Sequence, residues 1–270
     1  MPRPPFRTFD RPAPLSQAPL SHAVSDGSME GFPENVPCRV VLPIHHEAAY
    51  AYPLIIWLHD RGGDHRQVQR VMPLISSRNY VGIGIRGTQA LDPAGHHFGW
   101  SETHASTFTV ADRVDAAVRR ATSLSSIHPG RIVIAGYRQG GQMALRLAAA
   151  EPDRYAAAIA IDTSELTWTG CDLAALQKKN LPVLVQRFAD DVQTETQAFE
   201  EQLQQLRTLG MRVEAQLFAG EPSLCTEMLR GIDRWIMNRI VGGDWNDWSA
   251  PHASTAPCKP WEAALSTRMN

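Results

Sequence analysis

The amino-acid sequence predicts an α/β fold in which helices cover both faces of a mostly parallel central sheet. Short apolar stretches alternate along the chain with longer segments whose apolar residues recur every three or four positions. Several of these stretches, such as Leu54–Leu58 and Ala157–Ile161, are almost continuously apolar, which is typical of strands buried on both sides. The alternation itself favours parallel pairing, because each helix returns the chain to the same edge of the sheet.

Each element is predicted from its own pattern. The predicted strands are Arg39–Leu42, Leu54–Leu58, Tyr80–Ile85, Arg131–Ala135, Ala157–Ile161, Val183–Val185 and Arg212–Phe218. The predicted helices are marked by the stripe Val114, Ala117, Val118, Ala121 and Leu124, by the stripe Phe199, Leu203, Leu206 and Leu209, and by Met228–Ile240. Turn formers end two of these units, His128-Pro129-Gly130 the first and Gly210, as a C-terminal cap, the second.

Segments rich in proline and turn-forming residues flank this pattern. Residues 1–37 contain eight prolines and little hydrophobic periodicity, so we expect an N-terminal arm before an α/β domain at residues 38–241. Residues 242–270 form a C-terminal tail that carries Trp245, Trp248 and Trp261. We expect this tail to pack onto the domain, because tryptophan is favoured where it can bury a large ring. No internal repeat and no large lid domain are predicted.

Composition and charge exclude several classes of protein. The 270 residues include 26 Lys and Arg against 28 Asp and Glu, so the net charge of −2 gives no electrostatic basis for binding nucleic acid or an anionic membrane. No apolar run approaches the roughly 20 residues that span a bilayer. The N-terminal segment lacks the apolar stretch of a secretory signal, so a cytoplasmic location is expected.

Neither a cofactor nor a metal is expected. The four cysteines, Cys38, Cys171, Cys225 and Cys258, are far apart and form no CxxC pair, so we expect free thiols without a disulfide framework or zinc site. His59, Asp60, Asp64 and His65 lie close in sequence, but their spacing matches no helical metal-binding motif and glycines place them in a loop.

A strand, a glycine-flanked turn and a helix follow one another at residues 131–148, with the sequence RIVIAGYRQGGQMALRLA. Gly136 and Gly140 lie two residues before and after Arg138. Glycine on both sides of Arg138 favours a turn between the strand and the helix.

This segment resembles the nucleophile elbow G-x-S-x-G of the α/β-hydrolases, and residues 38–241 as a whole resemble their phospholipase/carboxylesterase branch. The stretch HDRGG that begins at His59 is similar to the family's HGxGG segment, with Asp60 in place of its first glycine. The resemblance implies that backbone N–H groups of Arg61 and Gln139 form an oxyanion hole, and it puts Asp190 at the position of the catalytic acid.

The residues that perform the family's chemistry are replaced in this chain. Arg138 stands at the position of the nucleophilic serine, and Pro222 stands at the position of the catalytic histidine. A guanidinium remains protonated and cannot attack a carbonyl, and proline has no titratable group. None of the ten histidines lies between Asp190 and the last predicted helix. We therefore expect a catalytically inactive, carboxylesterase-like protein.

Arg138 needs a partner, because an unpaired buried guanidinium is strongly unfavourable. We expect a pair with Asp190 or Asp60. A sharper alternative is that Arg138 and the N–H groups of Gln139 and Arg61 together bind a carboxylate or phosphate. The expected pocket is lined by His59, Asp60 and Trp100.

Three functions remain open. The first is binding of a protein partner or an anionic small molecule. The second is an active carboxylesterase that uses a histidine from the loop of His96, His97 and His104. The third is a structural subunit docked through its tails, and an oligomer is compatible with each function. Three serines are weighed as substitute nucleophiles and expected to be ordinary, since none lies on an elbow followed by a histidine: Ser101, Ser164 and Ser223.

Overall fold

The computed structural model describes residues 36–164, 173–188, 193–219, 223–238 and 252–254. The strands are β1 (Cys38–Val41), β2 (Tyr52–Leu58), β3 (Val81–Ile85), β4 (Gln89–Ala90), β5 (Phe98–Gly99), β6 (Ile127–Tyr137), β7 (Ala157–Ile161), β8 (Pro182–Phe188), β9 (Arg212–Phe218) and β10 (His252–Ser254). The α-helices are α1 (Gln67–Ile75), α2 (His104–Leu124), α3 (Gln139–Ala150), α4 (Leu173–Lys179), α5 (Gln193–Thr208) and α6 (Thr226–Ile236), and a 3₁₀ turn, η1, covers Pro152–Arg154.

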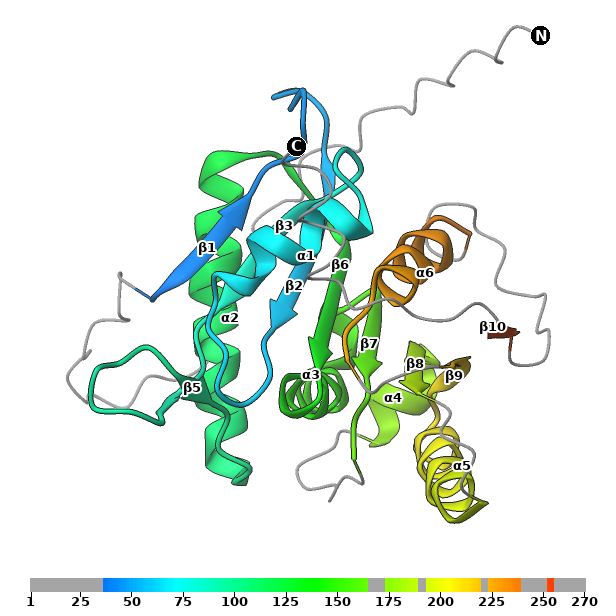
Figure 1. Ribbon diagram of the computed structural model, residues 1–270. Coiled ribbons are helices and arrows are strands. Elements are labelled where there is room, and N and C mark those ends of the chain that lie inside the picture. The colour runs from blue at the N-terminus through cyan, green and yellow to red at the C-terminus, as the bar shows by residue number, and fades with distance from the viewer. Residues whose placement is uncertain (1–35, 165–172, 189–192, 220–222, 239–251, 255–270) are drawn as a thin grey trace, which may run out of the picture. The chain divides into compact units, whose positions relative to one another are not determined.

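Eight strands form one sheet in the order β1-β3-β2-β6-β7-β8-β9-β10. Of these, β1 pairs antiparallel with β3, and every other pairing is parallel. The strands β2, β6 and β7 run in the same direction, so their carboxyl ends meet at one edge of the sheet (Figure 1). The predicted α/β architecture is confirmed, and the described residues contain no large lid.

The sheet separates two apolar clusters, as the near-continuous apolar strands require. Along β2, the side chains of Leu54, Ile56 and Leu58 belong to one cluster. Those of Ile55 and Trp57 belong to the other, because successive residues of a strand point to opposite faces. All five are almost completely buried. The strand is therefore covered on both sides, which excludes a sheet with one face in water.

Helices cover each face through their apolar stripes. Buried residues of α2, α3, α4 and α5 complete the first cluster. Buried residues of α1 and α6 complete the second, and these two helices also pack against each other. Most residues of the predicted stripes of α2 and α5 are buried or partly buried in the first cluster, but Leu124, at the end of α2, is 42% exposed. Gly210 follows α5 with a φ of +88°, as its role as a cap requires.

Several boundaries differ from the prediction by a few residues, and two of the differences have a clear local cause. The turn formers His128-Pro129-Gly130 lie inside β6, which begins at Ile127. They are accommodated because the pairing of β2 with β6 shifts register at this point, so the extra residues bulge out of the ladder. His104, which was expected in a loop, is the first residue of α2, whose N-terminus is capped by the Thr103 side chain. The short pair β4–β5 was not predicted, since two-residue strands leave no periodic pattern.

The expectation of free cysteines is wrong for Cys225, which is disulfide-bonded. Its partner lies outside the described residues, whereas Cys38 is a free thiol. Sequence spacing did not indicate the bond, because a disulfide depends on which cysteines the fold brings together and not on their separation along the chain.

Much of the predicted tails cannot be compared with the structure. The arm, apart from its last two residues, and the three tail tryptophans lie outside the described residues. The short strand β10 pairs with β9 and extends the sheet at that edge. Within the described residues, every helix is too short or too polar to span a bilayer.

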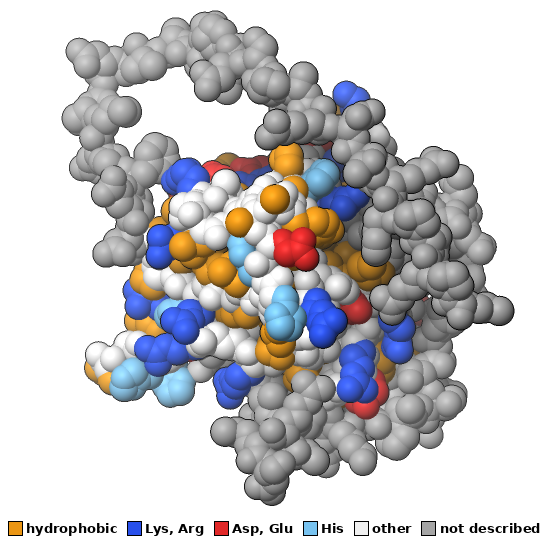
Figure 2. Space-filling model, turned by 90° about the horizontal axis from the view of Figure 1, so that it is seen from above, with side chains coloured by type: hydrophobic (Ala, Val, Ile, Leu, Met, Phe, Trp, Pro, Cys, Tyr) orange, Lys and Arg blue, Asp and Glu red, His pale blue; other side chains and the backbone are white. Residues whose placement is uncertain are grey.

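The view from above in Figure 2 shows basic side chains spread over the described part of that face, with hydrophobic and neutral side chains between them.

Candidate functional site

The turn between β6 and α3 has the sharp conformation that its glycines predict. Arg138 sits at the apex with φ +47° and ψ −113°, outside the regions that side-chain-bearing residues normally occupy. Its N–H is held by the carbonyl of Ile161 at 2.8 Å, and its carbonyl accepts the first helical bond from Gln142 at 3.0 Å. The neighbouring strand and the helix thus fix a strained residue at the carboxyl edge of the sheet.

The flanking glycines are required by close backbone contacts. A Cβ atom on Gly136 would lie 2.4 Å from the carbonyl group of Gly140. A Cβ atom on Gly140 would lie 2.2 Å from the carbonyl oxygen of Leu58, at the end of β2. No side chain fits at such distances, so the helix can start this close to the sheet only with glycine at both positions.

Arg138 forms ion pairs with two carboxylates. Its Nε donates to Asp162 Oδ2 at 3.0 Å, and its Nη1 lies 3.7 Å from Asp60 Oδ2. Its guanidinium also lies over the ring of Tyr137, 4.9 Å from the centroid. Burial disfavours the charge, but the bond to Asp162 and the nearby negative charges outweigh it, so the pKa of Arg138 is raised. The cation is therefore permanent.

The Asp60 carboxylate occupies the two backbone donors that were predicted to form an oxyanion hole. Its Oδ1 accepts from the N–H of Arg61 at 2.6 Å and from the N–H of Gln139 at 3.3 Å. Both predicted donors are thus bonded to a side chain of the same chain.

His59 is a buried structural residue. Its Nδ1 donates to the carbonyl of Asp60 at 2.7 Å, and its Nε2 accepts from the N–H of Gly87 at 2.9 Å, so one neutral tautomer satisfies both. Burial lowers the pKa of His59 to about 4. The ring of Trp100 lies 5.1 Å from this ring, between centroids. Its indole N–H donates to the carbonyl of His59, and the backbone N–H of Trp100 donates to Gln139 Oε1. These hydrogen bonds connect His59 and Trp100 to Gln139, the first residue of α3.

A polar cavity of about 380 Å³ opens beside Arg138. Its lining includes three carboxylates and two guanidiniums together with uncharged polar groups: Asp60, Glu102, Asp162, Arg61, Arg138, Gln139, Gln142 and Ser164. Gln142 donates to the Ser164 hydroxyl at 2.5 Å, which holds both side chains at the wall. Among the described residues, no group of three or more His, Cys, Asp or Glu side chains is arranged to hold a metal ion.

The structure places the predicted residues in different ways. The cavity is lined by four of them, Asp60, Arg61, Arg138 and Gln139. His59 and Trp100 are buried and do not line it, so the expectation that they do is wrong. Asp190 and Pro222 lie outside the described residues, so the proposed pair between Arg138 and Asp190 has no description in the structure.

Sequence reasoning missed Asp162 as a partner of Arg138. The signal was present, because Asp162 directly follows β7, the strand beside β6, and the residues after neighbouring parallel strands meet at one edge. Glu102 and Gln142 also line the cavity without having been predicted.

The alternative nucleophiles and bases have other contacts. Ser101 Oγ lies 3.5 Å from Thr103 Oγ1, and Ser164 Oγ accepts from an amide, so among the described contacts neither is bonded to a histidine. His97 Nδ1 lies 2.8 Å from the Gly62 carbonyl oxygen, and the exposed His104 ring packs edge-on against Phe108.

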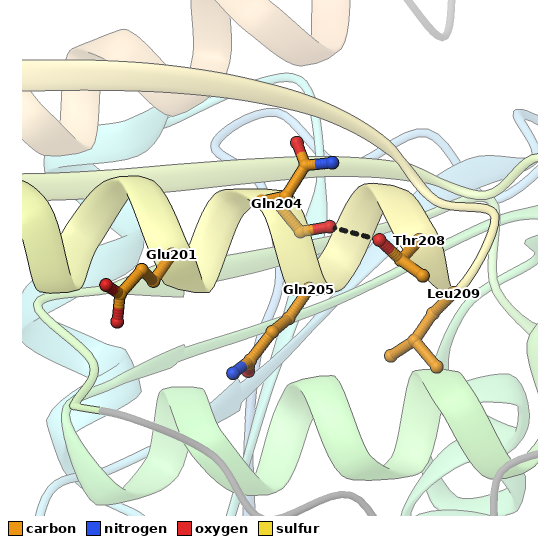
Figure 3. A pocket seen from close by; sticks show the side chains of 5 residues that line it. All are labelled: Glu201, Gln204, Gln205, Thr208 and Leu209. Atoms are coloured by element: carbon orange, nitrogen blue, oxygen red, sulfur yellow. Dashed lines mark hydrogen bonds between the residues drawn. The ribbon is translucent and has the colours of Figure 1, made fainter.

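A second cavity, of about 440 Å³, lies along α5 and its C-terminal end (Figure 3). Its lining consists of Glu201, Gln204, Gln205, Thr208 and Leu209. Thr208 donates to the Gln204 carbonyl at 2.8 Å, a contact within the helix. With a single titratable side chain, this lining offers no acid–base pair or nucleophile, so the elbow cavity is the better candidate site.

Comparison with known proteins bears on this site. Residues 96–240, more than half of the chain and including the elbow, match the model of the phospholipase/carboxylesterase family. Over 110 residues the chain is 30% identical to NocK of Nocardia uniformis subsp. tsuyamanensis, which is provisionally named an esterase; this covers 38% of the chain and only 30% of NocK.

Solved structures share the fold at low sequence identity. YahD, determined with malic acid, superposes with a TM-score of 0.59 at 15% identity and covers 76% of this chain and 99% of YahD. The carboxylesterase of Bacillus cereus gives 0.59 at 15% identity, covering 75% and 94% of the two chains, and esterase PE8 gives 0.57 at 18%, covering 75% and 98%. At these identities the likeness establishes the fold alone.

Proposed function

Because the chain belongs to the phospholipase/carboxylesterase family, we propose that it is a catalytically inactive member that acts by binding at the elbow cavity and does not hydrolyse esters. The observation that carries this proposal is the chemistry of Arg138. It occupies the apex where the family presents a nucleophile, and its guanidinium is held cationic by Asp162 and Asp60. A cation has no electron pair with which to form an acyl-enzyme.

The state of the backbone donors supports the same proposal. Stabilising a developing oxyanion requires N–H groups that are free when the substrate arrives. Here the N–H groups of Arg61 and Gln139 are bonded to Asp60. A substrate carbonyl would have to displace a charged ligand that is part of the protein. Nucleophile and oxyanion stabilisation are therefore both altered.

The environment of His59 also supports inactivity. A general base must be within hydrogen-bond reach of the proton that it removes. The ring nitrogens of His59 are both engaged with backbone groups, and burial lowers its pKa to about 4, which makes it a poor base at neutral pH. The role left to the cavity is recognition of a small polar molecule or of a polar group on a partner protein.

Hydrolysis of p-nitrophenyl acetate and butyrate by the purified chain tests this proposal. We expect a rate equal to the buffer blank for the wild type and for an Arg138→Ala variant. Ser164→Ala is the matched control, because it removes the one hydroxyl that lines the described cavity. A wild-type rate proportional to protein concentration would show an active hydrolase. Loss of that rate in Ser164→Ala would identify Ser164 as the nucleophile.

A further inference from the structure

We propose that Asp60 is an internal ligand of the elbow donors and determines the specificity of the cavity, by excluding carboxylates and phosphates from it. The inference rests on the proposed binding function and names the class of ligand that this site rejects. The sequence analysis assigned Arg138 and the N–H groups of Arg61 and Gln139 to an anionic ligand. Because Asp60 already contacts all three, we no longer expect the ligand to be an anion.

The first argument is occupancy. One oxygen of Asp60 accepts from both backbone donors, at 2.6 Å from Arg61 and 3.3 Å from Gln139, while the other lies 3.7 Å from Arg138. These are the three contacts that an external carboxylate would make at this place. Bonds between N–H groups and an ionised carboxylate are among the stronger hydrogen bonds in proteins.

The second argument is competition. Asp60 is joined to Arg61 by one peptide bond, so it is present at the donors at a high effective concentration that a free anion must exceed. The loop that carries Asp60 is itself fixed, because the carbonyl of Asp60 accepts from His59 and from the N–H of Gly63. The backbone that carries the carboxylate therefore stays beside the donors.

The third argument is charge. The described lining of the cavity holds three carboxylates against two guanidiniums, and Arg138 already faces two of those carboxylates. An incoming anion would be repelled by Asp60, Glu102 and Asp162 at short range. A polar molecule that presents hydroxyl or amide groups meets no such repulsion.

The test uses acetate and inorganic phosphate as probes, with the amide resonances of Arg61 and Gln139 in ¹H–¹⁵N spectra as the readout. Four proteins are compared: the wild type, Asp60→Ala, Asp60→Asn and Asp64→Asn. Asp60→Ala frees both donors and removes one repelling charge. Asp60→Asn keeps a side-chain oxygen on the donors without the charge. Asp64→Asn is the matched control, because Asp64 lies in the same loop but binds Arg66 and does not line the cavity.

We expect Asp60→Ala to bind acetate at least tenfold more tightly than the wild type, with shifts at both reporter amides, and Asp64→Asn to behave as the wild type. Asp60→Asn should lie between the wild type and Asp60→Ala, because its oxygen still occupies the donors but no longer repels the anion. Equal binding by the wild type and Asp60→Ala would overturn the proposal, and so would anion binding by Asp60→Asn as tight as that by Asp60→Ala.

A measurement on the unmodified protein covers the case in which Asp60→Ala fails to fold. If the carboxylate is bonded to both amides, acetate and phosphate at millimolar concentration leave the Arg61 and Gln139 resonances of the wild type in place; concentration-dependent shifts of both would contradict the assignment. Ester hydrolysis by the wild type would contradict the proposed function without affecting the interpretation of these anion measurements. Anion binding by the wild type would end only the inference.

Discussion

Arg138 and Asp162 join the ends of two neighbouring parallel strands through a bond of 3.0 Å between Nε and Oδ2, and both residues have positive φ angles, +47° and +52°. Backbone bonds hold each of them in place, since Arg138 N–H binds the carbonyl of Ile161 and Asp162 N–H binds the carbonyl of Gln186. Two residues with positive φ thus face each other at the carboxyl edge of the sheet. The Arg138 side chain is 42% exposed, so the ion pair contributes only about 0–1 kcal/mol of stability.

The first prediction separates backbone strain from the ion pair at Arg138. Arg138→Gly and Arg138→Ala both remove the guanidinium, but only glycine accepts this φ and ψ without strain. We expect Arg138→Gly to be more stable than Arg138→Ala by about 1 kcal/mol or more. Urea denaturation midpoints of the two variants measure the difference.

A matched pair in a regular helix reverses the sign. At Arg120, an exposed position of α2, glycine should be less stable than alanine by about 1 kcal/mol. The same order at both sites, with alanine the more stable, would show that the elbow is not strained in solution.

The second prediction concerns pH and His59. Burial lowers the pKa of His59 from 6.5 to about 4, so the unfolded chain binds this proton more readily than the folded one. The stability contributed by the neutral ring is therefore complete above pH 6.5 and is lost as the pH falls towards 4, by up to about 3 kcal/mol.

His59→Gln checks that assignment, because the glutamine oxygen can accept from Gly87 without titrating. We expect the free energy of unfolding of this variant to depend less steeply on pH between 6.5 and 4 than that of the wild type. His104→Gln, which changes an exposed ring, should keep the wild-type slope. A titration midpoint near 6.5 for His59 in NMR spectra would contradict the burial described for it.

The third prediction is the thiol count. Of the four cysteines, the structure describes Cys225, which is disulfide-bonded, and Cys38, which is free, and we expect one disulfide and two thiols in all. Denatured, unreduced protein should therefore react with two equivalents of a thiol reagent, and reduced protein with four. Cys225→Ser should lower the free energy of unfolding by about 2–4 kcal/mol under oxidising conditions. Four reactive thiols before reduction would contradict the bond.

The fold could be predicted from the sequence because buried parallel strands leave a strong signal. Ala157–Ile161 was predicted with its observed bounds, since an apolar run between turn residues has little alternative. The start of β6 could not be, because a proline and a glycine that normally end an element are absorbed here by a register shift between two strands. Local residue preferences do not reveal such a tertiary contact.

The site was only partly predictable. The two elbow glycines fixed the turn, and the replaced first glycine of HDRGG drew attention to Asp60. That the Asp60 carboxylate turns back onto the neighbouring N–H of Arg61 is a matter of side-chain conformation, which spacing does not encode. Asp162 was within reach of sequence reasoning, by asking which residue follows each strand next to the elbow.

The most direct test of the account restores the missing groups in the existing scaffold. A variant carrying Asp60→Gly, Arg138→Ser and Pro222→His regains free donors, a nucleophile and a base at the positions indicated by the family resemblance. We predict that the wild type hydrolyses p-nitrophenyl acetate no faster than buffer, while the triple variant exceeds it by about 10²-fold. Wild-type hydrolysis that survives Arg138→Ala would contradict the account, because the chemistry would then reside in groups other than those at the elbow.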